Sequence, residues 1–340
     1  MVDILSLSYS ELEKQILDLG LPKYRTAQIV QWLGRGCRNF DEMTNLPNDL
    51  RQRLSAQFSL FAPELLRKQV SAEDGTMKFL WGLKDGNSVE TVFMRYHYGN
   101  SVCISSQVGC RQSCAFCAST LGGLVRSLTA GEMYDEVLFT EQSAGDSVSN
   151  IVLMGIGEPL DNYESVTSFL RMISRPDMRN IGLRHITVST CGLPDQIRKL
   201  ADENLPITLS LSLHAPDDET RSRIMPSNRG VNVVMQACEY YLRTTGRRIS
   251  FEYAMISGVN DSLVQARQLA ALAKRIGAHV NLIPLNHVEE RKFLPSTPEV
   301  IASFRDVLTK DGVNVTVRRR LGSDIDASCG QLRRKYSTTR

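Results

Sequence analysis

Apolar positions recur at helical spacing in the first sixty residues. Residues 10–13, Ser-Glu-Leu-Glu, have the pattern of a capping box at the start of a helix. The apolar positions between Ala27 and Leu33 lead into Gly34, a residue type that commonly ends helices, and a third helix is expected after Pro47. We expect residues 1–60 to form a helical N-terminal accessory domain.

The pattern changes to a period of two between residues 64 and 97. Met77, Phe79 and Trp81 alternate with other residues, and the pair Asp85-Gly86 is typical of a hairpin turn. We expect residues 61–98 to form a short β-hairpin element that links the helical domain to a main domain of residues 99–340.

From residue 101 onward, short apolar runs alternate with helical patterns. The segments that we expect to be strands are 101–106, 149–155, 185–189, 206–213, 248–255, 279–284 and 313–319. The segments that we expect to be helices are 130–142, 162–174, 194–203, 232–245, 261–275 and 297–310. Strands separated by single helices predict an α/β fold with a parallel sheet, open or closed into a barrel. Sites in such folds lie at the carboxyl ends of the strands, where this chain has several polar residues.

Composition narrows the class of protein. Hydrophobic residues make up 42% of the chain and charged residues 23%, as in an ordinary globular protein. No run approaches the roughly 18 apolar residues of a membrane-spanning helix, and the first residues lack the pattern of a secretory signal, so we expect a cytoplasmic protein without a membrane partner. The net charge is only +3, but residues 316–340 hold seven basic residues against two acidic ones, which suits either a polyanionic partner or a solvated terminus.

Cys110, Cys114 and Cys117 place three thiols within eight residues. In a chain without an export signal, such thiols are expected to be ligands or reactive groups rather than disulfides. A zinc site usually takes four ligands from two separated pairs. No second pair is visible, although one further ligand could come from a histidine: His185, His214 or His287. Three thiolates instead favour an iron–sulfur cluster that keeps one iron open for a small molecule.

The spacing of the triplet, its position after the first strand of a βα series, and Phe116 within it resemble the radical S-adenosylmethionine (SAM) superfamily. This resemblance implies a partial (βα)6-type barrel and one [4Fe-4S] cluster held by Cys110, Cys114 and Cys117. It further implies that SAM chelates the open iron and is cleaved to a 5′-deoxyadenosyl radical. Residues 155–159, Gly-Ile-Gly-Glu-Pro, are similar to the superfamily's second-strand motif, which holds the amino group of SAM.

Longer stretches over the whole chain resemble the RlmN/Cfr family of RNA methyltransferases. These stretches are residues 89–92, 101–110, 157–160, 210–216, 281–286 and 324–332. The resemblance implies methylation of carbon 2 of an adenosine in 23S rRNA and in tRNAs by a monomeric enzyme that takes electrons from a flavodoxin-like donor. The related Cfr-type activity at carbon 8 is an alternative. A zinc-stabilised RNA-binding module without catalysis is an alternative from another class.

The resemblance also implies two SAM molecules per turnover and two further reactive thiols. Cys329 takes a methyl group from the first SAM and becomes S-methylcysteine. The radical from the second SAM removes a hydrogen from that methyl group, and the resulting methylene radical adds to carbon 2. Cys103 then assists loss of the carbon 2 proton and closes a transient disulfide with Cys329. Carbon 2 of adenine is neither nucleophilic nor appreciably acidic, so the cofactor must supply the radical.

Further site residues follow from the same resemblance. Glu90 matches a position assigned as a proton acceptor, although a solvent-facing hairpin carboxylate is the alternative. The positions that match SAM contacts are Gly157, Glu158, Ser189, Ser212, Leu213, His214 and Asn286. A structural role is the alternative for His214, which has apolar neighbours. Cys37, Cys191 and Cys238 are expected to have no catalytic role.

Two groups of basic residues are candidates for contacts to RNA phosphates. The first flanks Cys329 and consists of Arg318–Arg320 and Arg333–Lys335. The second lies in the helical domain and consists of Arg25, Arg35, Arg38, Arg51 and Arg53, for which a solvated helix face is an equal alternative. A base that is to react inside a barrel must leave its stack.

Overall fold

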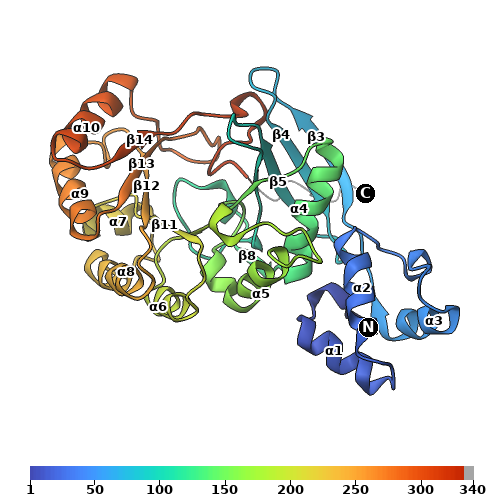
Figure 1. Cartoon of the computed structure of the whole chain (residues 1–340). Coiled ribbons are helices and arrows are strands. Elements are labelled where there is room, and N and C mark those ends of the chain that lie inside the picture. Colours follow the sequence, from blue (N-terminus) through green and yellow to red (C-terminus); the bar gives the residue numbers. More distant parts are fainter. Residues whose placement is uncertain (333–340) are drawn as a thin grey trace.

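One sheet of ten strands organises the protein, which we describe over residues 1–332 from a computed structural model (Figure 1). The strand order is β14-β13-β12-β11-β10-β9-β6-β5-β4-β3. Neighbours from β6 to β14 run parallel, whereas β3, β4, β5 and β6 pair antiparallel. The parallel βα series therefore carries an antiparallel extension at one edge.

The seven predicted strand segments of the main domain are all confirmed as parallel strands. They are β6 (Ser101–Cys103), β9 (Asn150–Leu153), β10 (Ile186–Thr190), β11 (Thr208–Ser212), β12 (Ser250–Met255), β13 (His279–Pro284) and β14 (Val315–Val317). The six predicted helices are confirmed as α4 (Ala130–Ala144), α5 (Tyr163–Ile173), α6 (Pro194–Asp202), α8 (Val231–Thr245), α9 (Leu263–Ile276) and α10 (Pro298–Lys310). The helices lie outside the curved sheet in Figure 1, which confirms the partial barrel with one parallel strand beyond six.

One helix of the barrel escaped prediction. This helix, α7 (Asp218–Ile224), has seven residues, of which only Ile224 is aliphatic. Asp217 caps it by accepting a hydrogen bond from the Thr220 amide at 2.7 Å. A helix this short offers too few turns for an apolar period to stand out.

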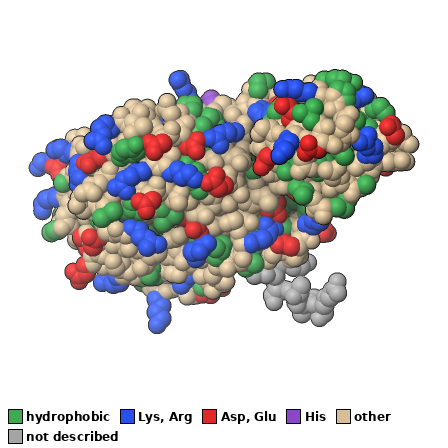
Figure 2. All heavy atoms as spheres, turned by 90° about the horizontal axis from the view of Figure 1, so that it is seen from below, with side chains coloured by type: hydrophobic (Ala, Val, Ile, Leu, Met, Phe, Trp, Pro, Cys, Tyr) green, Lys and Arg blue, Asp and Glu red, His purple; other side chains and the backbone are tan. Residues whose placement is uncertain are grey.

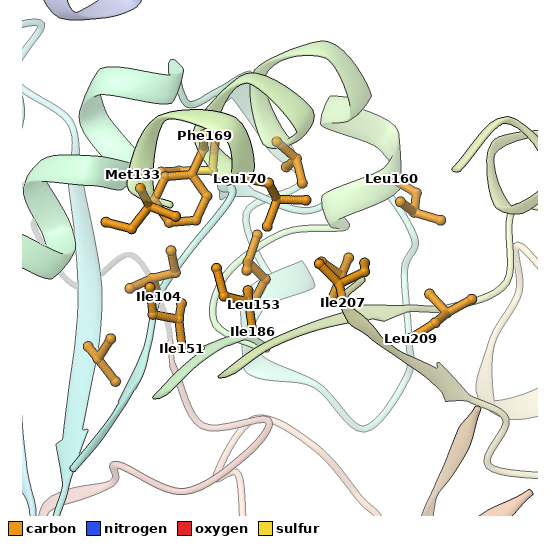
Figure 3. Packing of buried hydrophobic residues seen from close by; sticks show 14 of the residues in the cluster. Ile104, Met133, Ile151, Leu153, Leu160, Phe169, Leu170, Ile186, Ile207 and Leu209 are labelled. Atoms are coloured by element: carbon orange, nitrogen blue, oxygen red, sulfur yellow. The ribbon is translucent and has the colours of Figure 1, made fainter. Parts of the chain in front are cut away.

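The main core fills the space between the sheet and the helices (Figure 3). Ile151 and Leu153 of β9 face Phe169 and Leu170 of α5, and Met133 of α4 packs beside them. All five side chains are buried. Parallel strands that are covered by helices have nearly continuous apolar sequences, so their positions could be predicted from the sequence.

Three strands, β3 (Glu64–Val70), β4 (Met77–Gly82) and β5 (Ser88–Met94), form the antiparallel extension. The predicted hairpin is confirmed between β4 and β5, and Gly86 in its turn has a φ of +80°. The element has one strand more than a hairpin. It also continues the barrel sheet, because Val92 of β5 pairs with Cys103 of β6.

The N-terminal segment forms three helices, α1 (Tyr9–Asp18), α2 (Tyr24–Gly34) and α3 (Asn48–Gln57), beside the barrel (Figure 1). The first begins two residues earlier than predicted, because Ser8 rather than Ser10 forms the capping box with Glu11. The unit is fastened to α4, where the Tyr134 hydroxyl donates to the Gly34 carbonyl at 3.1 Å.

The remaining elements are short. Two strand pairs lie outside the main sheet, β1 (Val2–Asp3) with β2 (Phe58–Ser59) and β7 (Gln107–Gly109) with β8 (Leu124–Ser127). The 3-10 turns are η1 (Ile4–Ser6), η2 (Phe40–Glu42), η3 (Ala118–Thr120), η4 (Pro159–Asn162), η5 (Leu183–His185) and η6 (Ser323–Ile325). Within residues 1–332, no helix has the length and apolar character needed to cross a membrane.

Candidate active site

Two adjoining cavities occupy the carboxyl ends of the parallel strands. The larger has a volume of about 990 Å³, part of it open to solvent. The predicted site residues that line it are Cys110, Cys114, Cys117, Gly157, Glu158, Ser189, Ser212, His214, Asn286 and Cys329. The second cavity, of about 620 Å³, is lined by both Cys103 and Cys329. Cys329 therefore belongs to both cavities, together with Asn286 and Arg318.

The loop of the cysteine triplet begins where backbone segments meet closely. Gly109 has a φ of +78°, and a Cβ atom there would lie 1.9 Å from the carbonyl oxygen of Gly123. Only glycine fits such a position. The other end of the loop is held by Arg291, whose Nη2 donates to the Cys117 carbonyl at 2.9 Å and to the Thr120 hydroxyl at 2.6 Å. The three thiols are thus presented to one cavity by a fixed loop.

The donor set of this loop fits an iron–sulfur cluster. Burial raises the pKa of the Cys110 thiol to about 12, and the negative charge of Cys117 acts in the same direction. The same two causes, burial and the neighbouring thiols, raise the pKa of Cys114. Three thiolates in one mainly apolar cavity repel one another, and cationic iron would relieve that repulsion. Thiolate sulfur is also a soft ligand that iron–sulfur clusters prefer. Within residues 1–332, no three His, Cys, Asp or Glu side chains already have the arrangement of a metal site, so the ligand role of the triplet stays a prediction.

The histidines do not complete a zinc site in the described chain. His185 contacts Asn150 at 3.2 Å, and neither His185 nor His287 is among the residues that line the larger cavity. His214 does line it, but its Nδ1 accepts a hydrogen bond from the Ala254 amide at 3.0 Å. Of the three histidines, only His214 therefore lies at the cavity of the triplet.

Glu158 lines the larger cavity together with the three cysteines of the triplet. Gly157 before it has a φ of +110°, and a Cβ atom there would lie 2.6 Å from Cβ of Gln107. The Glu158 carboxylate accepts hydrogen bonds from the amides of Leu160 at 3.0 Å and Cys191 at 2.7 Å. Burial raises its pKa, while these hydrogen bonds act against that rise. A buried carboxylate beside the thiol loop suits a cationic amino group.

The ends of β10 and β11 are tied together by a residue that the sequence analysis missed. Ser189 and Ser212 lie 3.2 Å apart through their hydroxyls. Behind them Arg221 of α7, only 1% exposed, donates from Nε to the Leu213 carbonyl at 3.0 Å and from Nη2 to the carbonyls of Ser212 and Cys191. Leu213 itself is buried in the main core and is not among the cavity-lining residues, so a SAM contact by its side chain finds no support.

His214 is held by its neighbours and also lines the larger cavity. Its backbone has a φ of +57°, and its ring meets Phe116 edge-on, with centroids 5.0 Å apart. Burial, together with the positive charge of Arg221, lowers its pKa to about 3. The imidazole is therefore neutral near pH 7. Because Nδ1 accepts a hydrogen bond, Nε2 carries the proton and can donate into the cavity.

The segment that carries Cys329 is docked onto the loop after the triplet. The Ala118 amide donates to the Gly330 carbonyl at 2.8 Å, and the Ser119 hydroxyl donates to the Leu332 carbonyl at 2.8 Å. Asn286 donates from Nδ2 to the carbonyl of Cys329 itself at 3.0 Å. Two segments more than 200 residues apart in sequence are thereby joined.

Cys103 is buried, whereas Cys329 is exposed. Burial raises the pKa of Cys103, and the negative charge of Cys329 raises it further. The eight cysteines of the chain are all free in the structure, so the predicted disulfide between Cys103 and Cys329 is not observed. A disulfide that belongs to one stage of a catalytic cycle remains a prediction.

Arg318 faces this site, which differs from the expectation that it contacts RNA phosphates. Its Nη1 donates to Sγ of Cys329 at 3.7 Å and lies 3.5 Å from Oε2 of Glu252. The Glu252 side chain is 3% exposed, and its Oε1 accepts hydrogen bonds from Ser210 at 2.7 Å and Asn281 at 2.9 Å. Burial alone would lower the pKa of Arg318, but the negative charges of Cys329 and Glu252 outweigh it and raise the pKa.

Glu90 does not face solvent, so the alternative of a solvent-facing hairpin carboxylate is wrong. Its side chain is buried, and Oε1 lies 3.5 Å from Nζ of Lys78. The same Nζ donates to the Asp326 carbonyl at 3.0 Å, which ties Glu90 to the segment of Cys329. Glu90 is not among the residues that line either cavity, and its proton-acceptor role stays a prediction.

The basic residues that were candidates for RNA contacts differ in their surroundings. Arg38 pairs with the buried Asp135 of α4, so it joins the helical unit to the barrel, and the expectation that it contacts RNA is wrong. The segment Arg333–Lys335 lies outside the described residues. On the face in Figure 2, basic and acidic side chains are interspersed, as on an ordinary solvated surface.

Comparison with known proteins agrees with this geometry. Residues 2–60 match the family model of the ribosomal RNA large subunit methyltransferase N-terminal domain, and residues 104–270 match that of the radical SAM superfamily. The chain is 52% identical to a protein of Desulforamulus reducens over 99% of this chain and 97% of the relative, and 50% identical to one of Lachnoclostridium phytofermentans over 99% and 95%. Both relatives are described as probable dual-specificity RNA methyltransferase RlmN.

Solved structures share the fold. A radical SAM methyltransferase from Sphaerobacter thermophilus superposes with a TM-score of 0.92 at 42% identity, over 98% of this chain and 100% of the other. The hydrogenase maturase HydG superposes with a TM-score of 0.52 at 14% identity, over 66% of this chain and 52% of the other, which shows a common barrel fold alone.

Proposed function

Because the chain belongs to the RlmN family of dual-specificity RNA methyltransferases in the radical SAM superfamily, we propose that it methylates carbon 2 of an adenosine in 23S rRNA and in tRNA. The observation that carries this proposal is the place of Cys329, which lines both the cavity of the cysteine triplet and the cavity of Cys103. A residue that accepts a methyl group on one side and hands it to a base on the other needs such a position.

The larger cavity is the proposed site of the cofactors. Cys110, Cys114 and Cys117 would hold one [4Fe-4S] cluster, and Glu158 and Asn286 would contact SAM. When bound, the cluster and two SAM molecules per turnover supply an electron, a methyl group and a carbon-centred radical. The neutral His214 offers a hydrogen-bond donor without adding a second positive charge beside the SAM sulfonium.

Cys329 is the proposed methyl acceptor. Its thiolate sulfur forms a bond to the methyl carbon of SAM while the bond from that carbon to the sulfonium sulfur breaks, which leaves S-methylcysteine and S-adenosylhomocysteine. Asn286 fixes the backbone of Cys329, and Arg318 contacts its sulfur, so both residues position the acceptor.

Cys103 is the proposed resolving thiol. It shares the second cavity with Cys329. Its thiolate would form an S–S bond to Cys329 while the bond from that sulfur to the methylene carbon breaks. The electron pair goes to the carbon, which takes a proton and leaves as the methyl group of the RNA. Such a transient disulfide is a known use of this bond in the cytosol. The second cavity is also where the base would enter, so its lining favours Cys103 over Glu90 as the group that meets the carbon 2 proton.

Mass spectrometry of nucleosides tests this function. The protein, reconstituted with iron and sulfide without oxygen, is incubated with SAM, a flavodoxin-type reductant and either 23S rRNA or tRNA. We expect 2-methyladenosine from both RNAs and none from the Cys329→Ala variant. A product methylated at carbon 8 would replace the proposed reaction with the Cfr type. A colourless protein that binds zinc and RNA but forms no product would contradict the enzyme altogether.

A further inference from the structure

Two tyrosines form a stack on the loop that follows β5. The rings of Tyr96 and Tyr98 lie 4.9 Å apart at an interplanar angle of 9°. His97 meets Tyr98 at an angle of 82°, so its ring does not extend the parallel stack. Tyr98 is 62% exposed, which makes it one of the most exposed large hydrophobic side chains of the described residues.

The stack begins inside the cavity of the two reactive thiols. Tyr96 lines that cavity together with Cys103 and Cys329, and its hydroxyl contacts Sδ of Met94 at 3.7 Å. Burial raises the pKa of Tyr96, as does the neighbouring Tyr98, while the charge of Arg318 lowers it. The pair thus extends from the half-buried Tyr96, which lines the cavity, to the exposed Tyr98, which is stacked on it.

Positive charge lines the same cavity. Arg319 and Arg320 belong to its wall, and Arg320 is held in place by donating from Nη2 to the Leu285 carbonyl at 3.3 Å. Aromatic rings beside arginines are the usual means of holding unpaired RNA, because every base has a face that stacks and every nucleotide has a phosphate.

We propose that Tyr98, backed by Tyr96, is a stacking site for an unpaired nucleobase next to the target adenosine of the RNA substrate. This inference rests on the proposed function. The target base must leave its neighbours to reach the thiols, and its departure exposes the faces of those neighbours. A neighbouring base stacked on Tyr98 would recover the lost contact and hold the strand open. Arg319 and Arg320 would meet the phosphates on either side.

Fluorescence of a labelled substrate tests the stacking site. The RNA is one that the wild-type enzyme methylates, with 2-aminopurine placed in turn on either side of the target adenosine. We expect quenching of its fluorescence on binding to the wild type and to Tyr98→Phe, because stacking needs the ring and not the hydroxyl. Tyr98→Ala should lose the quenching and bind the RNA about 5- to 150-fold more weakly, the usual range for one base–aromatic stack.

Two controls separate this inference from the proposed function. Tyr240→Ala removes a tyrosine on α8 that pairs with Asp202 away from both cavities, and it should bind like the wild type. Methylation of Cys329 by SAM without RNA should be equal in Tyr98→Ala and wild type. If the wild type methylates RNA but Tyr98→Ala binds and quenches as well as it does, the stacking site is wrong. If the wild type methylates no RNA, the proposed function fails first.

Discussion

Nη1 of Arg318 lies 3.7 Å from Sγ of Cys329 and 3.5 Å from the buried carboxylate of Glu252. Arg318 leaves the end of β14, where its own amide donates to the Leu282 carbonyl at 2.9 Å. Arg318 is thus held at its backbone by Leu282 and at its guanidinium by Glu252. An exposed cysteine acquires a fixed place between two cavities through this contact.

Loss of this contact should slow the acceptance of the methyl group. We expect Arg318→Ala to methylate Cys329 about 10- to 100-fold more slowly, because a misplacement of about 1 Å costs as much in a displacement reaction. Mass spectrometry of the peptide that contains Cys329, after reaction with SAM in the absence of RNA, measures the rate. Arg319→Ala is the matched control and should react at the wild-type rate. Equal rates for both variants would remove Arg318 from a positioning role.

Cys103→Ala should leave methyl transfer to Cys329 intact and stop the release of product. Without the second thiol, no disulfide can form, so the RNA stays bonded to the protein through the methylene carbon. We expect a band of protein–RNA adduct on a denaturing gel, which nuclease shifts back close to the free protein while the target nucleotide stays attached to Cys329. Full turnover without adduct would reassign Cys103 to packing against its neighbour in the sheet, Val92.

Gly109→Ala should abolish cluster binding without unfolding the chain. A Cβ atom at this position would clash with the backbone of Gly123, and the φ of +78° is unfavourable for alanine as well. We expect iron and sulfide contents near zero after reconstitution, with an unchanged circular dichroism spectrum. Gly122→Ala is the control, because nothing lies within 4 Å of a Cβ atom there. Normal iron content in Gly109→Ala would show that the loop does not need this geometry.

The free energy of unfolding should decrease as the pH rises from about 4.5 to about 8, because the carboxyl group of Glu136 is buried. Burial raises the pKa of Glu136 from 4.5 to about 8, although hydrogen bonds from the Ser105 amide and the Thr91 hydroxyl oppose the rise. In this window the folded state holds a proton that the unfolded state has released. The contribution of Glu136 is therefore complete below pH 4.5 and is lost as the pH rises towards 8.

Denaturation of wild type and Glu136→Gln at pH 5 and pH 8 measures this effect. Glutamine cannot titrate, so the variant should lose less stability over the window, by on the order of 3 kcal/mol. Glu289→Gln, a change at an exposed position, is the control and should keep the wild-type slope. An identical slope in wild type and Glu136→Gln would mean that Glu136 titrates normally.

Helices and strands could be predicted where the pattern of apolar residues repeats within a short segment. All seven parallel strands were found because each is a short apolar run, and the six longer helices because each spans several turns. The helix α7 was too short for this, and with it Arg221 was missed, although Arg221 ties the carbonyls of Ser212 and Leu213 together. The start of α1 was misplaced because Ser8 and Ser10 are each followed three residues later by a glutamate, and the structure makes Ser8 the cap while Ser10 lies within the first turn of the helix.

The available reactive groups are visible in the order of the amino acids: three thiols at fixed spacing, the Gly-x-Gly-Glu turn, and two further cysteines in distinctive stretches. Each is a local pattern, since a few consecutive residues carry it. Which of these groups come into contact depends on how the chain packs. In the folded chain Arg318 contacts Sγ of Cys329, and Glu90 lies beside Lys78 and not in solvent. Arg38 forms an ion pair with Asp135. These outcomes depend on packing between segments far apart in the chain, where the cost of burying a charge selects its partner, and no local pattern records that choice.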